Sequence, residues 1–219
     1  MPAPNPATNP TRRTILFTAL LLSLVFVTRF AQLTRVAAKD DSVDPSDMNQ
    51  GVPDVGKLNP QAPPELSRFA FLLGNWKCEA KLLQANGTWQ KLDAAWHGRF
   101  ILDGYAIQDE YRMIGPTGEL IVLGMNIRSY DAANHRWSIK WLNALTGTWT
   151  DLASQEFGGV NFANHSVTYV FKEPTAPHPY TRATYTDISK THFTWKGEQS
   201  TDAKSWTEFM IVECHRTNP

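Results

Sequence analysis

The sequence predicts an all-β fold: an up-and-down antiparallel β-barrel of about ten strands, preceded by a short helix. From residue 75 onward, apolar and polar side chains alternate with the period of two that is typical of β-strands. Turn-forming residues interrupt this alternation at short intervals, and no long helical pattern separates the strands. Strands without helical crossovers favour an antiparallel meander, and closure of the meander would remove both exposed edges.

The helix is expected between Pro64 and Gly74. Proline suits a first helical position, and glycine suits the position just after a last turn. Between them Leu66, Phe69 and Leu73 recur on one face.

The strands are expected to begin directly after this helix. Asn86-Gly87 is the strongest hairpin signal, because both positions of its turn tolerate a positive φ. Further turn signals divide the chain into the expected strands 75–85, 88–101, 104–113, 119–130, 135–143, 148–157, 165–172, 180–187, 191–197 and 205–216.

The same region has the composition of one folded domain. All 8 tryptophans, all 6 tyrosines and 8 of the 11 phenylalanines lie in residues 65–219. A barrel of this many strands has a wide interior, so a ligand cavity is expected. A flattened sandwich with a solid core is the alternative that the same alternation allows.

Residues 1–38 are expected to be an export signal peptide, which would make the protein periplasmic or secreted. They hold four arginines and no acidic residue, and an apolar run extends over the 15 residues 14–28. As a helix this run is about 22 Å long, short for a bilayer core of about 30 Å. The small residues Val36, Ala37 and Ala38 suit a cleavage site.

Two questions about this segment stay open. An uncleaved membrane anchor is the alternative to cleavage, with Arg29 and Arg35 just beyond the apolar run. Arg12 and Arg13 partly match the twin-arginine motif, so either that route or the general secretory route fits. In both cases the membrane would be contacted only through this segment.

Residues 39–64 are expected to be a disordered linker between the signal peptide and a barrel domain at 65–219. The linker holds five prolines, five aspartates and no aromatic residue. Such a composition cannot bury enough apolar surface to offset the entropy of ordering it.

The charge balance limits the possible partners. The whole chain has 21 basic and 21 acidic residues, but without residues 1–38 the balance is 17 to 21, a net charge of −4. This charge does not favour nucleic acid or an anionic membrane surface as a partner of the barrel domain. Two cysteines and scattered histidines do not predict a metal site, and no cofactor is expected. The sequence does not predict an oligomeric state.

Four stretches of the sequence resemble a known family. The run 71–76 places Gly-x-Trp after a short helix, as in calycin barrels, the group of lipocalins and fatty-acid-binding proteins. The stretches 99–105, 108–111 and 130–144 narrow the resemblance to a bacterial family of lipocalin-like domains whose function is unassigned. The resemblance covers residues 64–216 and implies a small antiparallel barrel with an N-terminal helix, but no activity. The chain departs from the family pattern at two positions. The family often has glycine at the position of Asp103 and aspartate at the position of Asn143.

Alternation also predicts which residues face the interior. On the fourth expected strand these are Ile121, Leu123, Met125 and Ile127. The residues expected to contact a ligand are mostly aromatic and lie on three of the expected strands: Trp96, Phe100, Tyr111, Trp137, Trp141 and Asn143. They would line an apolar pocket or fill the barrel completely, and for Asn143 a turn at the strand end is favoured over a ligand contact.

Asp109 and Glu110 are the candidate catalytic acids. Asp109 shares an apolar face with Tyr111, where a buried carboxylate would need a partner and would serve as ligand anchor or proton donor. The interpretation that we favour is a strand irregularity that turns Asp109 outward and leaves Glu110 inside.

Cys78 lies on the first expected strand and Cys214 on the last. These strands are neighbours in a closed barrel, so a disulfide across the seam is possible in an exported protein. Two inert buried thiols are the alternative.

The leading functional hypothesis is an exported barrel that binds or carries a small apolar or amphipathic molecule. The first alternative is a cofactor-independent isomerase, cyclase or hydrolase that uses Asp109 or Glu110. The second is a haem-binding barrel with His215 or His192 as axial ligand.

Overall fold

The computed structural model describes residues 56–173 and 177–217. All described residues belong to one compact unit. The expected signal peptide and most of the expected linker therefore lie outside the described residues. No helix in the described part of the chain is long and apolar enough to cross a membrane.

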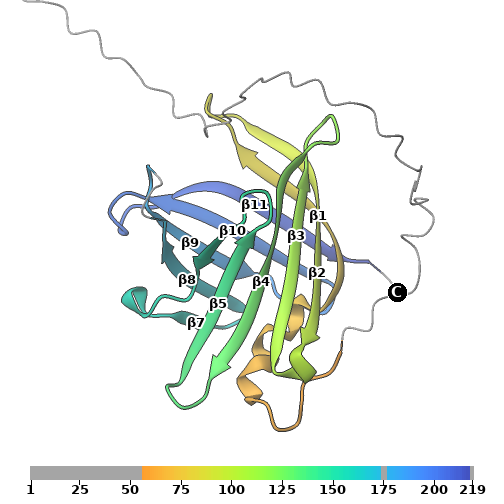
Figure 1. Cartoon of the computed structure of the whole chain (residues 1–219). Helices are drawn as coiled ribbons and strands as arrows, with labels where there is room; N and C mark the ends of the chain where they lie inside the picture. Colours follow the sequence, from red (N-terminus) through yellow and green to blue (C-terminus); the bar gives the residue numbers. More distant parts are fainter. Residues whose placement is uncertain (1–55, 174–176, 218–219) are drawn as a thin grey trace, which may run out of the picture. The chain divides into compact units, whose positions relative to one another are not determined.

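The described residues form one antiparallel sheet of eleven strands, which confirms the all-β prediction. Along the sheet the order is β6-β5-β4-β3-β2-β1-β11-β10-β9-β8-β7. Every paired couple of strands is therefore consecutive in sequence except β1 and β11, and the consecutive strands β6 and β7 form the two edges. The sheet curves so that β3 to β5 lie opposite β8 to β10 (Figure 1). The strands are β1 (Gly74–Leu83), β2 (Trp89–Ile101), β3 (Ala106–Ile114), β4 (Leu120–Asp131), β5 (Arg136–Asn143), β6 (Thr148–Asp151), β7 (Val160–Ala163), β8 (Ser166–Lys172), β9 (Tyr180–Thr186), β10 (His192–Ser200) and β11 (Thr207–Arg216).

The prediction of a closed barrel is wrong, because the two edge strands β6 and β7 do not pair with each other. The expected strand 148–157 ends at Asp151, and a short 3-10 helix, η4 (Gln155–Phe157), follows it. Gly158 and Gly159 then adopt positive φ angles of 83° and 65°, which redirect the chain into the additional strand β7. Leu152 and Ala153, in the connection between β6 and β7, are buried. In a closed barrel this place would be taken by pairing between the two edge strands.

One end of the sheet is covered by the 3-10 helix η2 (Pro64–Leu72), which is drawn in orange in Figure 1. Its buried residues are Leu66, Phe69 and Leu72. The Phe69 ring packs edge-on against Trp137, with 4.8 Å between ring centroids. The carbonyl of Leu72 accepts a hydrogen bond of 3.1 Å from the indole of Trp76 on β1. These contacts bury the apolar face of the helix against the sheet.

The last part of the expected linker belongs to the fold. The side chain of Asn59 donates to the carbonyl of Asp103 at 3.1 Å, and its backbone N–H donates to Gly104 at 3.4 Å. Ala62 is buried. Gly104 permits the close approach, because a Cβ there would lie 2.3 Å from the carbonyl oxygen of Lys57. The boundary expected at residue 64 is therefore too late, and the packed chain includes residues 56–63.

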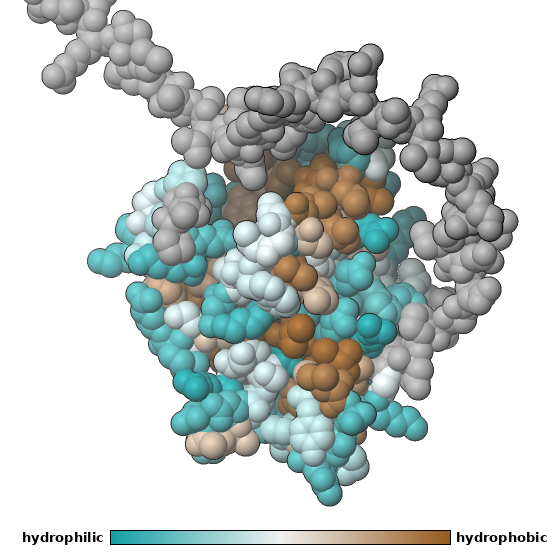
Figure 2. Space-filling model, in the orientation of Figure 1, coloured by the Kyte–Doolittle hydropathy of each residue, from teal (hydrophilic) through white to brown (hydrophobic). Residues whose placement is uncertain are grey.

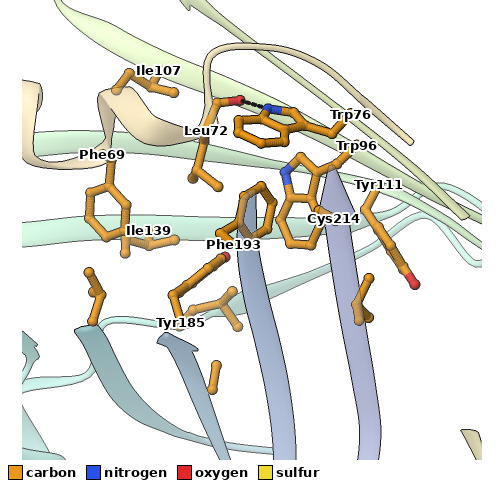
Figure 3. Close-up of a cluster of buried hydrophobic side chains, with 14 of the residues drawn as sticks. Phe69, Leu72, Trp76, Trp96, Ile107, Tyr111, Ile139, Tyr185, Phe193 and Cys214 are labelled. Atoms are coloured by element: carbon orange, nitrogen blue, oxygen red, sulfur yellow. Dashed lines mark hydrogen bonds between the residues drawn. The ribbon is translucent and has the colours of Figure 1, made fainter. Parts of the chain in front are cut away.

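Part of the hydrophobic core is a cluster of aromatic rings (Figure 3). Phe193 of β10 lies among Trp76, Trp96 and Tyr185, with centroid distances of 4.8, 5.6 and 6.1 Å. Most of these contacts are edge-to-face, the arrangement that the ring quadrupoles favour. The cluster joins β1 and β2 to β9 and β10 across the interior.

The orientation predicted for β4 is wrong. Gly124, Asn126 and Arg128 are buried, whereas the expected interior residues Leu123, Met125 and Ile127 alternate with them and are only partly buried. Apolar residues therefore appear as brown patches among hydrophilic ones on the strands that face the viewer in Figure 2. The alternation of apolar and polar side chains correctly identified β4 as a strand. It gave the wrong inward face, because the polar side chains of β4 have hydrogen-bond partners inside the sheet.

Candidate functional site

A cavity of about 270 Å³ lies inside the curved sheet, beyond the aromatic cluster. Side chains from both halves of the sheet line it, and most of them are apolar or aromatic. The lining residues are Trp96, Tyr111, Val122, Asn126, Trp141, Leu152, Tyr169, Phe171, Glu173, Thr181, Ala183, Trp195, Phe209, Met210 and Val212.

Trp96 and Tyr111 form one wall of this cavity. They are direct partners in the register of β2 and β3, and their ring centroids lie 5.0 Å apart. In Figure 3 the indole nitrogen of Trp96 points away from Tyr111, and the Tyr111 hydroxyl points away from Trp96. The two rings therefore present aromatic surface to the cavity. The Trp96 nitrogen lies at one end of this surface and the Tyr111 hydroxyl at the other.

Asp109 is the centre of a buried polar group beside the cavity. Its Oδ1 accepts hydrogen bonds from Trp96 Nε1 at 3.0 Å and from Asn126 Nδ2 at 2.8 Å. Its Oδ2 accepts from Arg128 Nε at 2.6 Å, and Arg128 Nη2 reaches Oδ1 at 3.2 Å. These bonds supply what a fully buried carboxylate requires in place of water.

Arg128 extends the polar group toward β9. Its Nη2 donates to the hydroxyl of Tyr185 at 3.0 Å, and its guanidinium lies 4.6 Å from the ring centroid of Phe69. Burial is the largest single effect and lowers the pKa of Arg128, but the Asp109 carboxylate together with Tyr185 and Tyr169 raises this pKa well above its ordinary value. Asp109 and Arg128 therefore form a buried ion pair whose charges offset each other.

Three buried polar atoms have no hydrogen-bond partner among the described residues: the Tyr111 hydroxyl, Asn126 Oδ1 and Arg128 Nη1. Tyr111 and Asn126 both line the cavity. Burial raises the pKa of Tyr111, so its hydroxyl keeps its proton at neutral pH. Buried groups without a protein partner are uncommon in folded proteins, so the two lining atoms are the polar atoms available to a molecule bound in the cavity.

Glu173 is the one charged side chain among the described residues that line the cavity. It follows β8 directly and continues the inward column of Tyr169 and Phe171. Its backbone N–H donates to the carbonyl of Pro179 at 2.7 Å, and its carboxylate has no partner among the described residues. Partial burial raises the pKa of this carboxyl group above its ordinary value of 4.5.

The residues expected to contact a ligand divide into two groups. Trp96, Tyr111 and Trp141 line the cavity. Phe100, Trp137 and Asn143 do not. Phe100 and Trp137 belong to the hydrophobic core around the helix, where Trp137 packs on Phe69. Asn143 accepts a hydrogen bond from the backbone of Leu145 at 3.0 Å in the turn after β5.

The favoured orientation of the two candidate acids is wrong. Asp109 is completely buried, whereas Glu110 faces outward and lies 3.6 Å from Arg112 on the surface. The strand stays regular at this point because Arg128, Asn126 and Trp96 supply the partners that an inward carboxylate needs. Asp109 is not among the residues that line the cavity.

His192 and His215 lie on the outer face of the sheet. They are register partners on β10 and β11, with ring centroids 4.7 Å apart, and each is adjacent to an inward residue, Phe193 or Cys214. Neither lines the cavity, so neither is placed as an axial ligand inside it. No group of three or more His, Cys, Asp or Glu residues in the described chain is arranged to hold a metal ion.

Cys78 and Cys214 are joined by a disulfide, the first of the two alternatives left open by the sequence. They are direct register partners on β1 and β11, with their Cα atoms 4.1 Å apart. The bond therefore lies at the one junction in the described sheet where strands distant in sequence pair.

Sequence reasoning did not identify Asn126, Arg128 or Glu173. A signal for the first two was present, because Asn126 and Arg128 alternate on one face of a strand adjacent to Asp109. A polar pair opposite an inward acid is the pattern expected of a buried ion pair. Glu173 lies in a predicted turn, where no periodicity indicates direction.

Comparisons with known proteins address the fold. No protein-family model matches the chain, and no curated protein matches it. The crystal structure of Rv2717c from M. tuberculosis matches with a TM-score of 0.53 and 9% identity, covering 72% of this chain and 99% of that chain. The fold is calycin-like. The S-type phycobiliprotein lyase CPES from Guillardia theta matches with a TM-score of 0.45 and 8% identity, covering 70% of this chain and 92% of that chain. At these identities the likeness concerns the fold alone.

Proposed function

We propose that this protein binds or carries a small apolar or amphipathic molecule inside the curved sheet. The observation that supports this proposal is the cavity of about 270 Å³, lined by aromatic rings and supplied with two unpartnered polar atoms. Small-molecule sites are typically apolar pockets with a few polar groups that fix orientation. The volume of about 270 Å³ lies just below the usual range of about 300–1,000 Å³ for ligand pockets. The ligand is therefore small, comparable with a compound of two or three aromatic rings.

The position of Asp109 does not favour the enzyme alternative. A general acid or base must reach the proton that it transfers. Asp109 is fully buried, outside the cavity lining, and held by Trp96, Asn126 and Arg128. Its arrangement is that of a structural ion pair beneath a binding site.

The binding proposal is tested with N-phenyl-1-naphthylamine, an uncharged probe whose emission rises in apolar surroundings. Ala183→Phe fills the cavity and should abolish the increase in emission, because Ala183 is a buried lining residue. Val122→Phe is a second filling variant at a half-buried lining position. Ala95→Phe is the matched control, since Ala95 is exposed on β2 and should leave binding unchanged.

Two results of this probe-binding experiment decide whether the proposal stands. Loss of probe binding in folded Ala183→Phe or Val122→Phe, with binding kept in Ala95→Phe, supports the cavity as the site. Absence of binding to the unaltered protein, together with no copurifying molecule in native mass spectrometry, would refute the proposed function.

We also propose that the protein is exported to the periplasm or secreted. Two observations support this: the arginine-bearing apolar segment in residues 1–38, and the disulfide, a bond that persists in oxidising compartments. Mass determination of the protein from fractionated cells tests it. A mature chain beginning after Ala38 outside the cytoplasm is expected, and a cytoplasmic chain starting at Met1 would contradict it.

A further inference from the structure

We propose that the cavity selects a neutral or positively charged aromatic molecule with a hydrogen-bond donor, and rejects carboxylates. This inference rests on the proposed binding function and specifies the chemical class of the ligand. It follows from two hydrogen-bond acceptors among the described lining side chains, Asn126 Oδ1 and the Glu173 carboxylate, and from the absence of a Lys, Arg or His side chain among those lining residues.

The first acceptor is Asn126 Oδ1. The neighbouring Asp109 carboxylate only accepts hydrogen bonds, so the amide atom that meets it at 2.8 Å must be the donor Nδ2. The reverse orientation would place two oxygens against each other. The ion pair with Arg128 holds Asp109 in place, and Asp109 in turn fixes the amide of Asn126. Its buried carbonyl oxygen therefore remains the unpartnered atom on the cavity side, where it requires a donor.

The second acceptor is the carboxylate of Glu173. It lines the cavity, is half-buried, and has no cationic partner among the described residues. A ligand carboxylate in the same cavity would be repelled by this charge in a poorly solvated space, where repulsion is stronger than in water. An ammonium or hydroxyl group would be attracted instead.

The nearest buried cation does not reverse this preference. Arg128 directs Nε and Nη2 at Asp109, contacts Tyr185 and Phe69, and is not among the lining residues. Its charge is offset by Asp109, so the pair presents no net charge to a ligand. The hydroxyl groups of Tyr111 and Thr181, which also line the cavity, either donate or accept and favour neither sign of charge.

The walls indicate an aromatic body for the ligand. Rings of Trp96, Trp141 and Trp195 line the cavity, together with Tyr169, Phe171 and Phe209. Such rings stack against or pack edge-on to a flat molecule, with a gain beyond that of simple burial.

The test is a matched series that shares one ring system: 2-methylnaphthalene, 2-naphthol, 2-naphthylmethylammonium and 2-naphthoate. Each compound displaces N-phenyl-1-naphthylamine from the unaltered protein at neutral pH. We expect 2-naphthol and the ammonium compound to bind at least about tenfold more tightly than 2-naphthoate, as for one hydrogen bond to a buried group. Equal or tighter binding of 2-naphthoate would overturn the inference.

Two variants assign the selectivity to its residues. Asn126→Leu should reduce the affinity for 2-naphthol to that for 2-methylnaphthalene, whereas Asn161→Leu, an exposed control on β7, should not. Glu173→Gln keeps the side-chain shape and should raise the affinity for 2-naphthoate while lowering that for the ammonium compound. If Asn126→Leu fails to fold, Glu173→Gln decides the test, because its site is only half-buried.

Failure of this inference differs from failure of the proposed function. If 2-methylnaphthalene binds and the four compounds do not differ, waters satisfy the polar atoms and the donor requirement is refuted while binding stands. If no compound binds and the probe does not bind either, the binding function itself is refuted.

Discussion

Arg128 on β4 donates a hydrogen bond from Nε to Oδ2 of Asp109 on β3 across 2.6 Å, and both side chains are completely buried. In the register Asp109 faces Asn126, so Arg128 reaches it diagonally. Arg128 of this ion pair contacts Tyr185 of the aromatic cluster, and Asp109 fixes the amide of Asn126, which lines the cavity.

Breaking this pair from one side should destabilise the protein strongly. Arg128→Met leaves a buried carboxylate without its counter-charge, at a cost of about 3–5 kcal/mol in the free energy of unfolding. Urea unfolding measures the change. The double variant Asp109→Leu/Arg128→Met should recover part of the loss, because it removes both charges. Glu110→Gln, at the exposed neighbour that pairs with Arg112, should leave the midpoint nearly unchanged. Equal effects of the buried and exposed variants would contradict this prediction.

Loss of the disulfide should lower stability by about 2–5 kcal/mol, because it joins residues 136 positions apart in sequence. The measurement compares urea unfolding of the unaltered protein with that of Cys78→Ala/Cys214→Ala, each with and without dithiothreitol. Reductant should destabilise the unaltered protein and leave the variant unaffected. Detection of two free thiols in unfolded, unreduced protein would show that the bond does not form.

Gly197→Ala should weaken probe binding several-fold with a smaller effect on stability. A Cβ at Gly197 would lie 2.5 Å from the Trp195 ring and 2.7 Å from the Phe209 ring, and both rings line the cavity. The rings must move, but no backbone atom is among these closest contacts. Titration with N-phenyl-1-naphthylamine, together with tryptophan emission, detects the change. Unaltered affinity and unaltered emission would show that the rings do not shape the site.

Glu173 should make the protein less stable as the pH rises. Its pKa in the folded state lies above the ordinary value of 4.5, so the folded state binds more protons than the unfolded state between the two values. The contribution of Glu173 to stability therefore falls from about pH 4.5 upward and levels off above its raised folded pKa. Glu173→Gln should remove this decline and stabilise the protein at neutral pH.

The control for this pH dependence is Glu156→Gln, at an exposed acid on η4. This variant should keep the decline of the unaltered protein, measured as the thermal midpoint across the acidic range. A Glu173→Gln curve that parallels the unaltered curve would show that burial does not affect this group.

The strands were predictable from sequence because their signals are local. Asn86-Gly87 forms the turn between β1 and β2, and period-two alternation identified the strands on both sides. The start of β6 was predicted, but its end was placed too late and the four-residue strand β7 was missed, since four residues are too few to show a period. The linker boundary was also missed, because residues 56–63 are held by contacts with the β2–β3 connection and not by a pattern of their own.

The candidate site was predictable only in part. Trp96, Tyr111 and Trp141 were identified because large aromatic residues on an inward face usually line the interior. On β4 the same rule selected Leu123, Met125 and Ile127, although Asn126 and Arg128 face inward. Hydrophobicity ranks residues one at a time, whereas the free energy of burying Arg128 depends on Asp109 of another strand.

The sequence by itself determined an antiparallel all-β domain with aromatic residues concentrated after residue 64, because strand period, turn chemistry and composition are properties of short segments. Only the tertiary structure decided that the sheet stays open between β6 and β7, that Asp109 points inward, and that a cavity remains beside it. Each of these depends on pairing between residues distant in sequence. A buried charge, a strand edge and an empty volume become favourable or unfavourable only once those partners are in place.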